Sequence, residues 1–209
     1  MTATMPTTQS TDFEEPGYGE EAGRANLYGV LATLFYEPPS QALLDGIAAS
    51  SGDNDSLLQQ AWNQLAGACR HADAAAVRDE YEALFIGVGK PEVMLYGSYY
   101  LSGFLMEKPL ATLRSELASL GLQRDERMPE SEDHIAGLCE VMRHLILSDD
   151  APSAGLDTQM RFFAGHMQPW VNEMCDAMLS HPDARFYKAV AVLAMRFFDV
   201  EKQAFDMAN

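Results

Sequence analysis

Large apolar residues recur at intervals of three and four along almost the whole chain, and this spacing limits the possible folds more than any other feature. Such spacing places side chains on one face of an α-helix. Prolines, glycines and short polar runs interrupt the pattern and divide the chain into separate helices. No stretch alternates polar and apolar residues for long enough to form a sheet, and no repeat period occurs. We therefore predict an all-α fold, a single-domain bundle of about eight to ten helices.

Several residues mark where individual helices should begin and end. Ser40, Asp73 and Ser131 each stand at the start of a periodic segment and are expected to act as helix caps. Pro109 suits the first turn of a helix, and Gly121 suits the left-handed residue that follows one. Four helices are predicted before residue 86.

The first residues differ in composition from the rest of the chain. Residues 1–19 are rich in Thr, Ser, Pro, Gly and acidic residues, and they offer little apolar surface to offset the entropy of ordering. We expect a flexible acidic tail over 1–19 and a single helical domain over 20–209.

The net negative charge of the chain disfavours partners that are themselves negatively charged. Asp and Glu number 31 against 14 Lys and Arg, which gives a formal net charge of −17. This charge repels nucleic-acid phosphates and anionic membrane surfaces. The chain shows neither an apolar run of the ~20 residues that a membrane span needs nor an export leader at its start. Three widely spaced cysteines do not suggest a disulfide framework, so we expect a reduced, cytoplasmic protein without nucleic-acid binding or stable membrane insertion.

An unusual segment, IGVGKPEVMLYGSYYL over 86–101, replaces the helical period with glycines, a proline and clustered aromatic residues. It is predicted to be a loop. Tyr96, Tyr99 and Tyr100 suit a recognition surface, because tyrosine combines apolar area with a polar tip. The alternative is that they cover one end of the bundle. Ser98 beside them is a weak candidate nucleophile, and a serine that satisfies backbone groups at a helix start is the favoured interpretation.

The ionisable residues give little support for catalysis. Glu130 and His134, like Glu140 and His144, lie four apart, whereas di-metal bundles use Glu-x-x-His pairs. The residues around Lys90 do not complete a phosphate loop, and no other nucleotide motif occurs. We expect no enzyme activity, no metal and no cofactor. Two alternatives stay open: a metal-binding or di-iron helical bundle enzyme, and a scaffold domain that recognises another partner through the tyrosines.

Asp133 and His134 stand at the start of a predicted helix. From the residues alone, the favoured role of Asp133 is structural, since an acidic residue in the first turn stabilises the helix dipole.

Three segments together resemble the TorD/DmsD/NarJ family of redox-enzyme maturation chaperones. They are RANLYGVLATLFYEPP (24–39), YEALFIGVGKPEVMLYGSYYL (81–101) and PESEDHIAGLCEVM (129–142). The residues that match the family's central motif are Leu84, Phe85, Gly87, Gly89 and Ser98. In place of its Pro-Pro-Trp run this chain has Met94, Leu95 and Tyr96, and Val88 replaces a proline. The Glu-x-x-Asp-His-Ile motif is complete in Glu130, Asp133, His134 and Ile135.

The resemblance implies a helical bundle of the TorD/DmsD type and a non-enzymatic cytoplasmic chaperone. Its expected partners are the twin-arginine signal peptide and the apo form of a molybdenum oxidoreductase catalytic subunit, held until cofactor insertion and export. The segment YGSYYLSGFLMEKPL is most similar to chaperones of formate dehydrogenases, with dimethyl sulfoxide and trimethylamine oxide reductases as alternative clients. A monomer and a helix-swapped dimer are both open.

The resemblance also implies a peptide-binding site. The residues expected to bind the peptide are Tyr81, Leu84, Phe85, Tyr96, Ser98, Tyr100, Glu130, Asp133 and His134. Among these, the aromatic and aliphatic side chains are expected to form an apolar groove. Asp133, with Glu130 or Glu132, is expected to accept a guanidinium group, and reading the motif this way reverses the purely structural role for Asp133.

Overall fold

Capping side chains and backbone turns set the helix ends, largely where the sequence predicted them. Ser40 Oγ accepts the Leu43 amide at 3.2 Å, and Asp73 Oδ2 accepts the Ala76 amide at 3.1 Å. Both residues are N-caps, as predicted. Gly121 follows a helix with a φ of 73°, the left-handed conformation that favours glycine.

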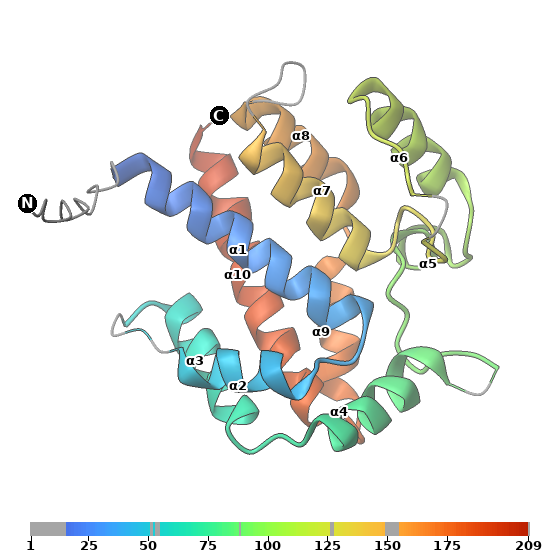
Figure 1. Cartoon of the computed structure of the whole chain (residues 1–209). Coiled ribbons are helices and arrows are strands. Elements are labelled where there is room, and N and C mark those ends of the chain that lie inside the picture. The colour runs from blue at the N-terminus through green and yellow to red at the C-terminus, as the bar shows by residue number, and fades with distance from the viewer. Residues whose placement is uncertain are drawn as a thin grey trace, which may run out of the picture.

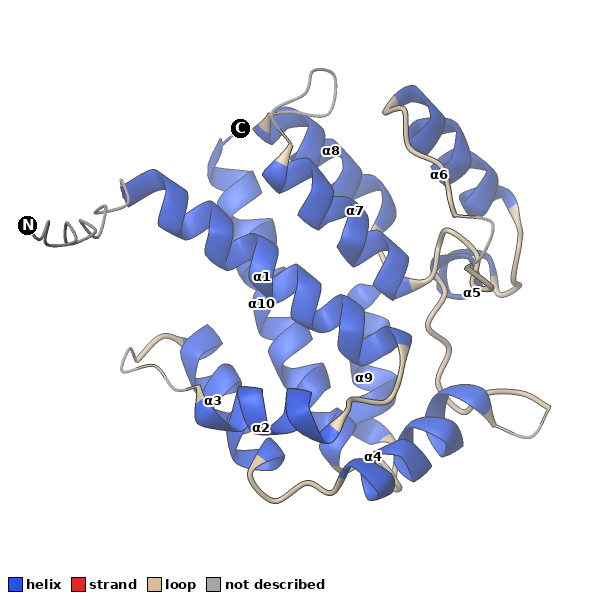
Figure 2. Cartoon of the chain, viewed as in Figure 1, coloured by secondary structure: helices blue, strands red, loops and turns tan. Residues whose placement is uncertain are grey.

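The computed structural model describes residues 16–50, 52, 55–87, 89–125, 128–148 and 155–208. The described residues form ten α-helices, one π-helix and no strand (Figures 1 and 2), which confirms the all-α prediction. The helices are α1 (Pro16–Tyr36), α2 (Gln41–Ala49), α3 (Leu57–Cys69), α4 (Ala74–Tyr81), η1 (Glu82–Ile86), α5 (Gly97–Ser102), α6 (Lys108–Ser119), α7 (Ile135–Leu147), α8 (Leu156–His166), α9 (Val171–Ser180) and α10 (Phe186–Ala208).

The long helices α1 and α10, together with α7, form the centre of the bundle. In Figure 1, α1 lies across the front against α7, and α10 runs behind α1. α10 also packs on α3 and α9, while α8 packs on α7 and α6 lies to one side near α5. The buried core between these helices includes Tyr28, Phe197 and Phe198 from α1 and α10. Each such ring contributes roughly 1.5–3 kcal/mol through burial, so the α1–α10 contact stabilises the bundle strongly.

A buried polar cluster fixes α1 against α10. Glu201 of α10 is 1% exposed and accepts Arg24 Nε at 2.7 Å and Nη2 at 2.8 Å. The Tyr28 hydroxyl donates to the same carboxylate at 2.9 Å. Burial and the nearby Glu201 raise the pKa of Tyr28 well above its ordinary value. The carboxylate is therefore satisfied by a bidentate guanidinium and a phenol, which is the condition for burying a charge.

The chain leaves α4 through a turn that requires glycine. The π-helix η1 continues α4, and Gly87 follows it with a φ of 62°. A Cβ atom on Gly87 would lie 2.6 Å from the Lys90 carbonyl oxygen. The chain then returns to η1, where the Val93 amide donates to the Leu84 carbonyl at 2.9 Å. This turn carries the chain from the core to the start of α5.

Three boundaries differ from the sequence predictions. Residue 86 belongs to η1 and residues 97–101 belong to α5, so the predicted loop over 86–101 is shorter. The N-cap of α7 is His134 and not Ser131. The predicted tail, residues 1–19, lies outside the described residues except for 16–19, which form the first turn of α1.

None of the helices in the described ranges is both long and apolar enough to cross a bilayer.

Candidate functional site

The starts of α5 and α7 are joined by two backbone hydrogen bonds. The Gly97 amide donates to the Asp133 carbonyl at 3.0 Å, and the Ile135 amide donates to the Leu95 carbonyl at 2.8 Å. These bonds form an isolated antiparallel bridge between Tyr96 and His134. The two sequence motifs that pointed to a peptide site are therefore neighbours in the fold.

Asp133 holds this junction together from inside. It is 4% exposed, its Oδ2 accepts the Ser98 amide at 2.8 Å, and its Oδ1 accepts the Ser131 hydroxyl at 2.6 Å. The Ser98 amide is one of the unpaired donors in the first turn of α5, so Asp133 caps α5 from another segment. Both carboxylate oxygens are used internally. Asp133 was expected to accept a peptide guanidinium; in the structure its two oxygens already accept hydrogen bonds from within the protein and hold the start of α5 in position.

His134 is a buried, neutral residue at neutral pH. Its Nδ1 accepts the Ala136 amide at 3.2 Å and caps α7, and its ring lies edge-on to Tyr96 with centroids 5.0 Å apart. Burial lowers the pKa of His134 to about 4, although the charges of Glu130 and Asp133 oppose this shift. His134 thus forms a wall of the site and contributes no positive charge.

Glu130 is the carboxylate of the motif that borders the cavity side of this junction, and its side chain contacts Tyr96. Its Oε2 accepts the hydroxyl of Tyr96, which is half-buried. Burial, together with this hydrogen bond, raises the pKa of Tyr96, which therefore stays a donor. No Lys or Arg of the described residues lies within ion-pair distance of Glu130. Tyr96 thus orients a carboxylate that has no Lys or Arg ion-pair partner among the described residues.

Glu132, by contrast, is occupied by two arginines. Arg114 Nη2 lies 2.8 Å from Glu132 Oε2, and Arg124 Nε lies 4.0 Å from Glu132 Oε1. Partial burial would raise the pKa of Glu132, but Arg114 and Arg124 outweigh it and the pKa is lowered. Glu132 is therefore ionised, and the two neighbouring arginines balance its negative charge.

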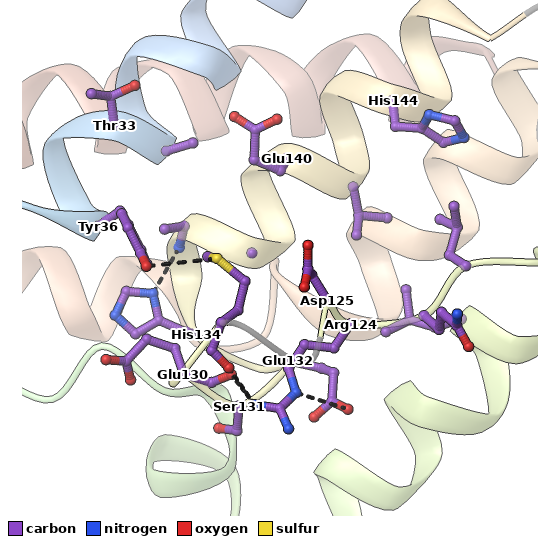
Figure 3. A pocket seen from close by; sticks show the side chains of 18 of the residues that line it. Thr33, Tyr36, Arg124, Asp125, Glu130, Ser131, Glu132, His134, Glu140 and His144 are labelled. Atoms are coloured by element: carbon purple, nitrogen blue, oxygen red, sulfur yellow. Dashed lines mark hydrogen bonds and ion pairs between the residues drawn. The ribbon is translucent and has the colours of Figure 1, made fainter.

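A cavity of about 490 Å³ lies beside Glu130 and His134, bordered by α1, α7 and the segment after α6 (Figure 3). Its apolar surface comes from Ala32, Tyr36, Leu117, Leu122, Met128 and Val141. Its acidic residues are Glu37, Asp125, Glu130, Glu132 and Glu140. On α7, the cavity follows one face from Ala136 to His144. The arrangement can bind an apolar segment that carries positive charge.

Three residues predicted for the groove lie in the core instead. Leu84 is fully buried, and Phe85 packs edge-on against Tyr187 with centroids 4.9 Å apart. The Tyr81 hydroxyl donates to the carbonyls of Phe35 at 3.1 Å and Tyr36 at 2.8 Å. These side chains face inward because α4 and η1 pack their apolar face on the bundle. They support the end of α1 and do not line the cavity.

Tyr100 and Ser98 also lie away from the cavity beside Glu130 and His134. The Tyr100 ring stacks on Trp170 with centroids 5.5 Å apart, and its hydroxyl donates to the Met94 carbonyl at 2.9 Å. Ser98 is buried, and its Oγ accepts the Met106 amide at 3.2 Å. Ser98 borders a separate cavity of about 140 Å³. Of the residues predicted to bind the peptide, only Tyr96, Glu130 and His134 lie at or beside the cavity between α1 and α7.

Sequence reasoning missed the part of the site that α1 and α7 supply. Thr33 and Tyr36 come from the end of α1, Glu37 directly follows it, and Glu140 and Val141 come from α7. The four-residue spacing of Ala136, Glu140 and His144 was visible in the sequence. Nothing in it showed that α1 would lie opposite.

Within the described ranges, no three His, Cys, Asp or Glu side chains are close enough to hold a metal ion. The metal-enzyme alternative therefore has no supporting ligand set in the described part of the chain.

Comparison with known proteins places both the fold and the family. The crystal structure of a protein from Archaeoglobus fulgidus, assigned as a redox enzyme maturation protein, matches with a TM-score of 0.55 at 19% identity. The match covers 93% of this chain and 99% of that one. The fold is thus that of the redox-enzyme maturation proteins. The family model of the nitrate reductase delta subunit matches residues 51–176.

Curated relatives agree with that match. The chaperone protein TorD of Vibrio cholerae El Tor is 24% identical, covering 88% of this chain and 92% of the relative. TorD of Vibrio parahaemolyticus is also 24% identical, over 83% of this chain and 90% of the relative. The chain belongs to the nitrate reductase delta subunit family, and it is a redox-enzyme maturation chaperone of the NarJ/TorD type and not an enzyme.

Proposed function

We propose that this chaperone binds the twin-arginine signal peptide of a molybdenum-dependent oxidoreductase precursor in the cavity between α1 and α7. It holds the apo catalytic subunit in the cytoplasm until cofactor insertion and export. The observation that carries the proposal is the apolar cavity with Glu130 at its edge, a carboxylate oriented by Tyr96. Such a leader offers a basic start followed by an apolar run, which matches these two features in order.

Apolar burial should supply most of the affinity. Each well-buried aliphatic side chain contributes roughly 1.5–3 kcal/mol, whereas an exposed arginine–carboxylate pair contributes about 0–1 kcal/mol. Charge should instead set orientation and the rate of encounter. We therefore place the apolar run of the leader along α7 and an arginine at Glu130.

The remaining motif residues act by holding the site in shape. Asp133 fixes the start of α5 through the Ser98 amide, and this keeps Tyr96 beside Glu130. His134 supplies a neutral wall and caps α7. The client is proposed to be a formate dehydrogenase, on the resemblance of the segment that contains α5.

Two matched substitutions test where the peptide binds. Thr33 and Thr112 are both exposed helical threonines whose hydroxyls donate to the carbonyl four residues earlier. Thr33 borders the cavity of about 490 Å³ between α1 and α7, and Thr112 borders the cavity of about 140 Å³ beside Ser98. We expect Thr33→Trp to weaken binding of a synthetic leader peptide by roughly tenfold in calorimetry, the loss of about one buried side chain.

Thr112→Trp should change the affinity by less than about twofold. Loss of binding in Thr112→Trp but not in Thr33→Trp would move the site to the smaller cavity. A wild-type protein that does not distinguish the leader peptide from a scrambled one would refute the proposed function.

A further inference from the structure

Arg124 lies at the edge of the proposed peptide site with its guanidinium against three acceptors. Its Nη1 donates to the Met128 carbonyl at 2.6 Å and to the Glu130 carbonyl at 3.1 Å. Its Nε lies 4.0 Å from Glu132 Oε1. All three acceptors belong to the segment that leads into α7, and Figure 3 shows the side chain reaching them at the cavity. The guanidinium is partly open to solvent, since the side chain is 37% exposed.

The position of this cation matters because it adjoins the carboxylate proposed for the peptide. Arg124 donates to the backbone of Glu130, while the Glu130 carboxylate accepts Tyr96 and has no Lys or Arg of the described ranges within ion-pair distance. A peptide guanidinium that approaches Glu130 therefore meets the like charge of Arg124. The peptide guanidinium also finds that the nearby carbonyls of Met128 and Glu130 already accept hydrogen bonds from Arg124. Among the described residues that line the cavity, Arg124 is the only Arg or Lys.

We propose that the guanidinium of a bound peptide displaces Arg124 from these acceptors, so that Arg124 and the peptide compete for the same positions. This inference rests on the proposed function and assigns the site's selectivity to a residue outside the recognised motifs. A ligand must supply a group that replaces the guanidinium geometry, and arginine does this better than lysine because its donors form a planar fork.

The same contacts allow a purely structural role, which predicts the opposite result. If Arg124 only holds residues 128–132 in place, its removal should loosen Glu130 and weaken binding. If Arg124 competes, its removal should vacate the acceptors, relieve the repulsion and strengthen binding. The sign of the change therefore decides between the two roles.

The experiment compares the wild-type protein with Arg124→Gln by calorimetric titration of a synthetic leader peptide that contains the two arginines. We expect Arg124→Gln to bind this peptide about threefold to tenfold more tightly, in line with an ion pair of modest strength at a partly exposed site. The gain should be smaller when both peptide arginines are replaced by lysine. It should vanish when both are replaced by glutamine. Circular dichroism checks that helix content is retained.

Arg114→Gln is the matched control. Arg114 contacts the same Glu132 carboxylate from α6 but is not among the residues that line the cavity, and its removal changes the net charge equally. An equal gain in Arg114→Gln, or an unchanged or weaker affinity in Arg124→Gln, would overturn the inference and leave the proposed function intact. Absence of leader binding by the wild-type protein would refute both.

Discussion

The Asp133 carboxylate accepts the Ser98 backbone amide at 2.8 Å, linking the start of α7 to the first turn of α5. This contact explains why an acidic residue of the recognised motif is buried. Asp133 acts on the site by fixing Tyr96 opposite Glu130 and His134. The geometry of Tyr96, Glu130 and His134 thus depends on a buried residue.

The first prediction is that Asp133→Ala destabilises the fold. It leaves the Ser98 amide and the Ser131 hydroxyl without their acceptor, which should lower the free energy of unfolding by about 2–3 kcal/mol. Urea unfolding measures this change. Asp176→Ala removes an exposed acidic residue on α9 and should stay within about 0.5 kcal/mol of the wild type. Equal stabilities for the two variants would show that the Asp133 contacts contribute nothing.

The second prediction concerns the polar cluster between α1 and α10. Glu201→Ala leaves Arg24 and Tyr28 without their shared acceptor in the interior, so we expect a loss of about 3–5 kcal/mol in urea unfolding. Asp206→Ala, an exposed change on the same helix, is the control. Replacing Arg24 by Met in the Glu201→Ala protein should recover part of the loss, because it removes a largely buried guanidinium whose remaining ion-pair partner is the exposed Glu21. Failure of the single variant to destabilise would contradict the assigned role of the cluster.

The third prediction is a pH dependence caused by His134. Its pKa is about 4 in the folded protein against 6.5 when unperturbed, so the unfolded chain binds the proton more readily. Stability should therefore fall as the pH is lowered from about 6.5 to about 4, by on the order of 2–3 kcal/mol from this group. Urea unfolding at pH 7 and pH 5 in wild type and His134→Asn would measure it.

Asparagine keeps an acceptor for the Ala136 amide but does not titrate, so the variant should lose less stability on acidification. His144→Asn, at an exposed position of α7, should behave like the wild type. An identical pH response in His134→Asn and wild type would mean that His134 is not the buried group responsible.

The sequence predicted the elements of the fold well because helix periodicity and caps are local. Ser40, Asp73 and Gly121 act within a few residues of themselves, and the structure confirms each one. The cap at α7 was mispredicted because the partner of Ser131 is the Asp133 side chain, a choice that depends on Ser98 in a distant segment.

The candidate site was only partly predictable, because it depends on contacts between segments that are distant in the sequence. The motif identified Glu130 and His134, and the aromatic segment supplied Tyr96, which contacts both. The sequence suggested that Phe85 lines the groove. It could not show that Phe85 is buried, because this burial depends on Tyr187, a residue of α10 about a hundred positions away. No local pattern distinguishes an aromatic residue that lines a cavity from one that packs in the core.

The central claim is that the leader lies between α1 and α7, and photo-cross-linking tests it most directly. A leader peptide with a benzophenone group in its apolar run would be bound, irradiated and mapped by mass spectrometry. We predict cross-links to residues 32–37, at the end of α1 and just after it, and to residues 136–144 of α7, suppressed by excess unlabelled leader. Cross-links confined to residues 81–85 and 99–106 would contradict the account.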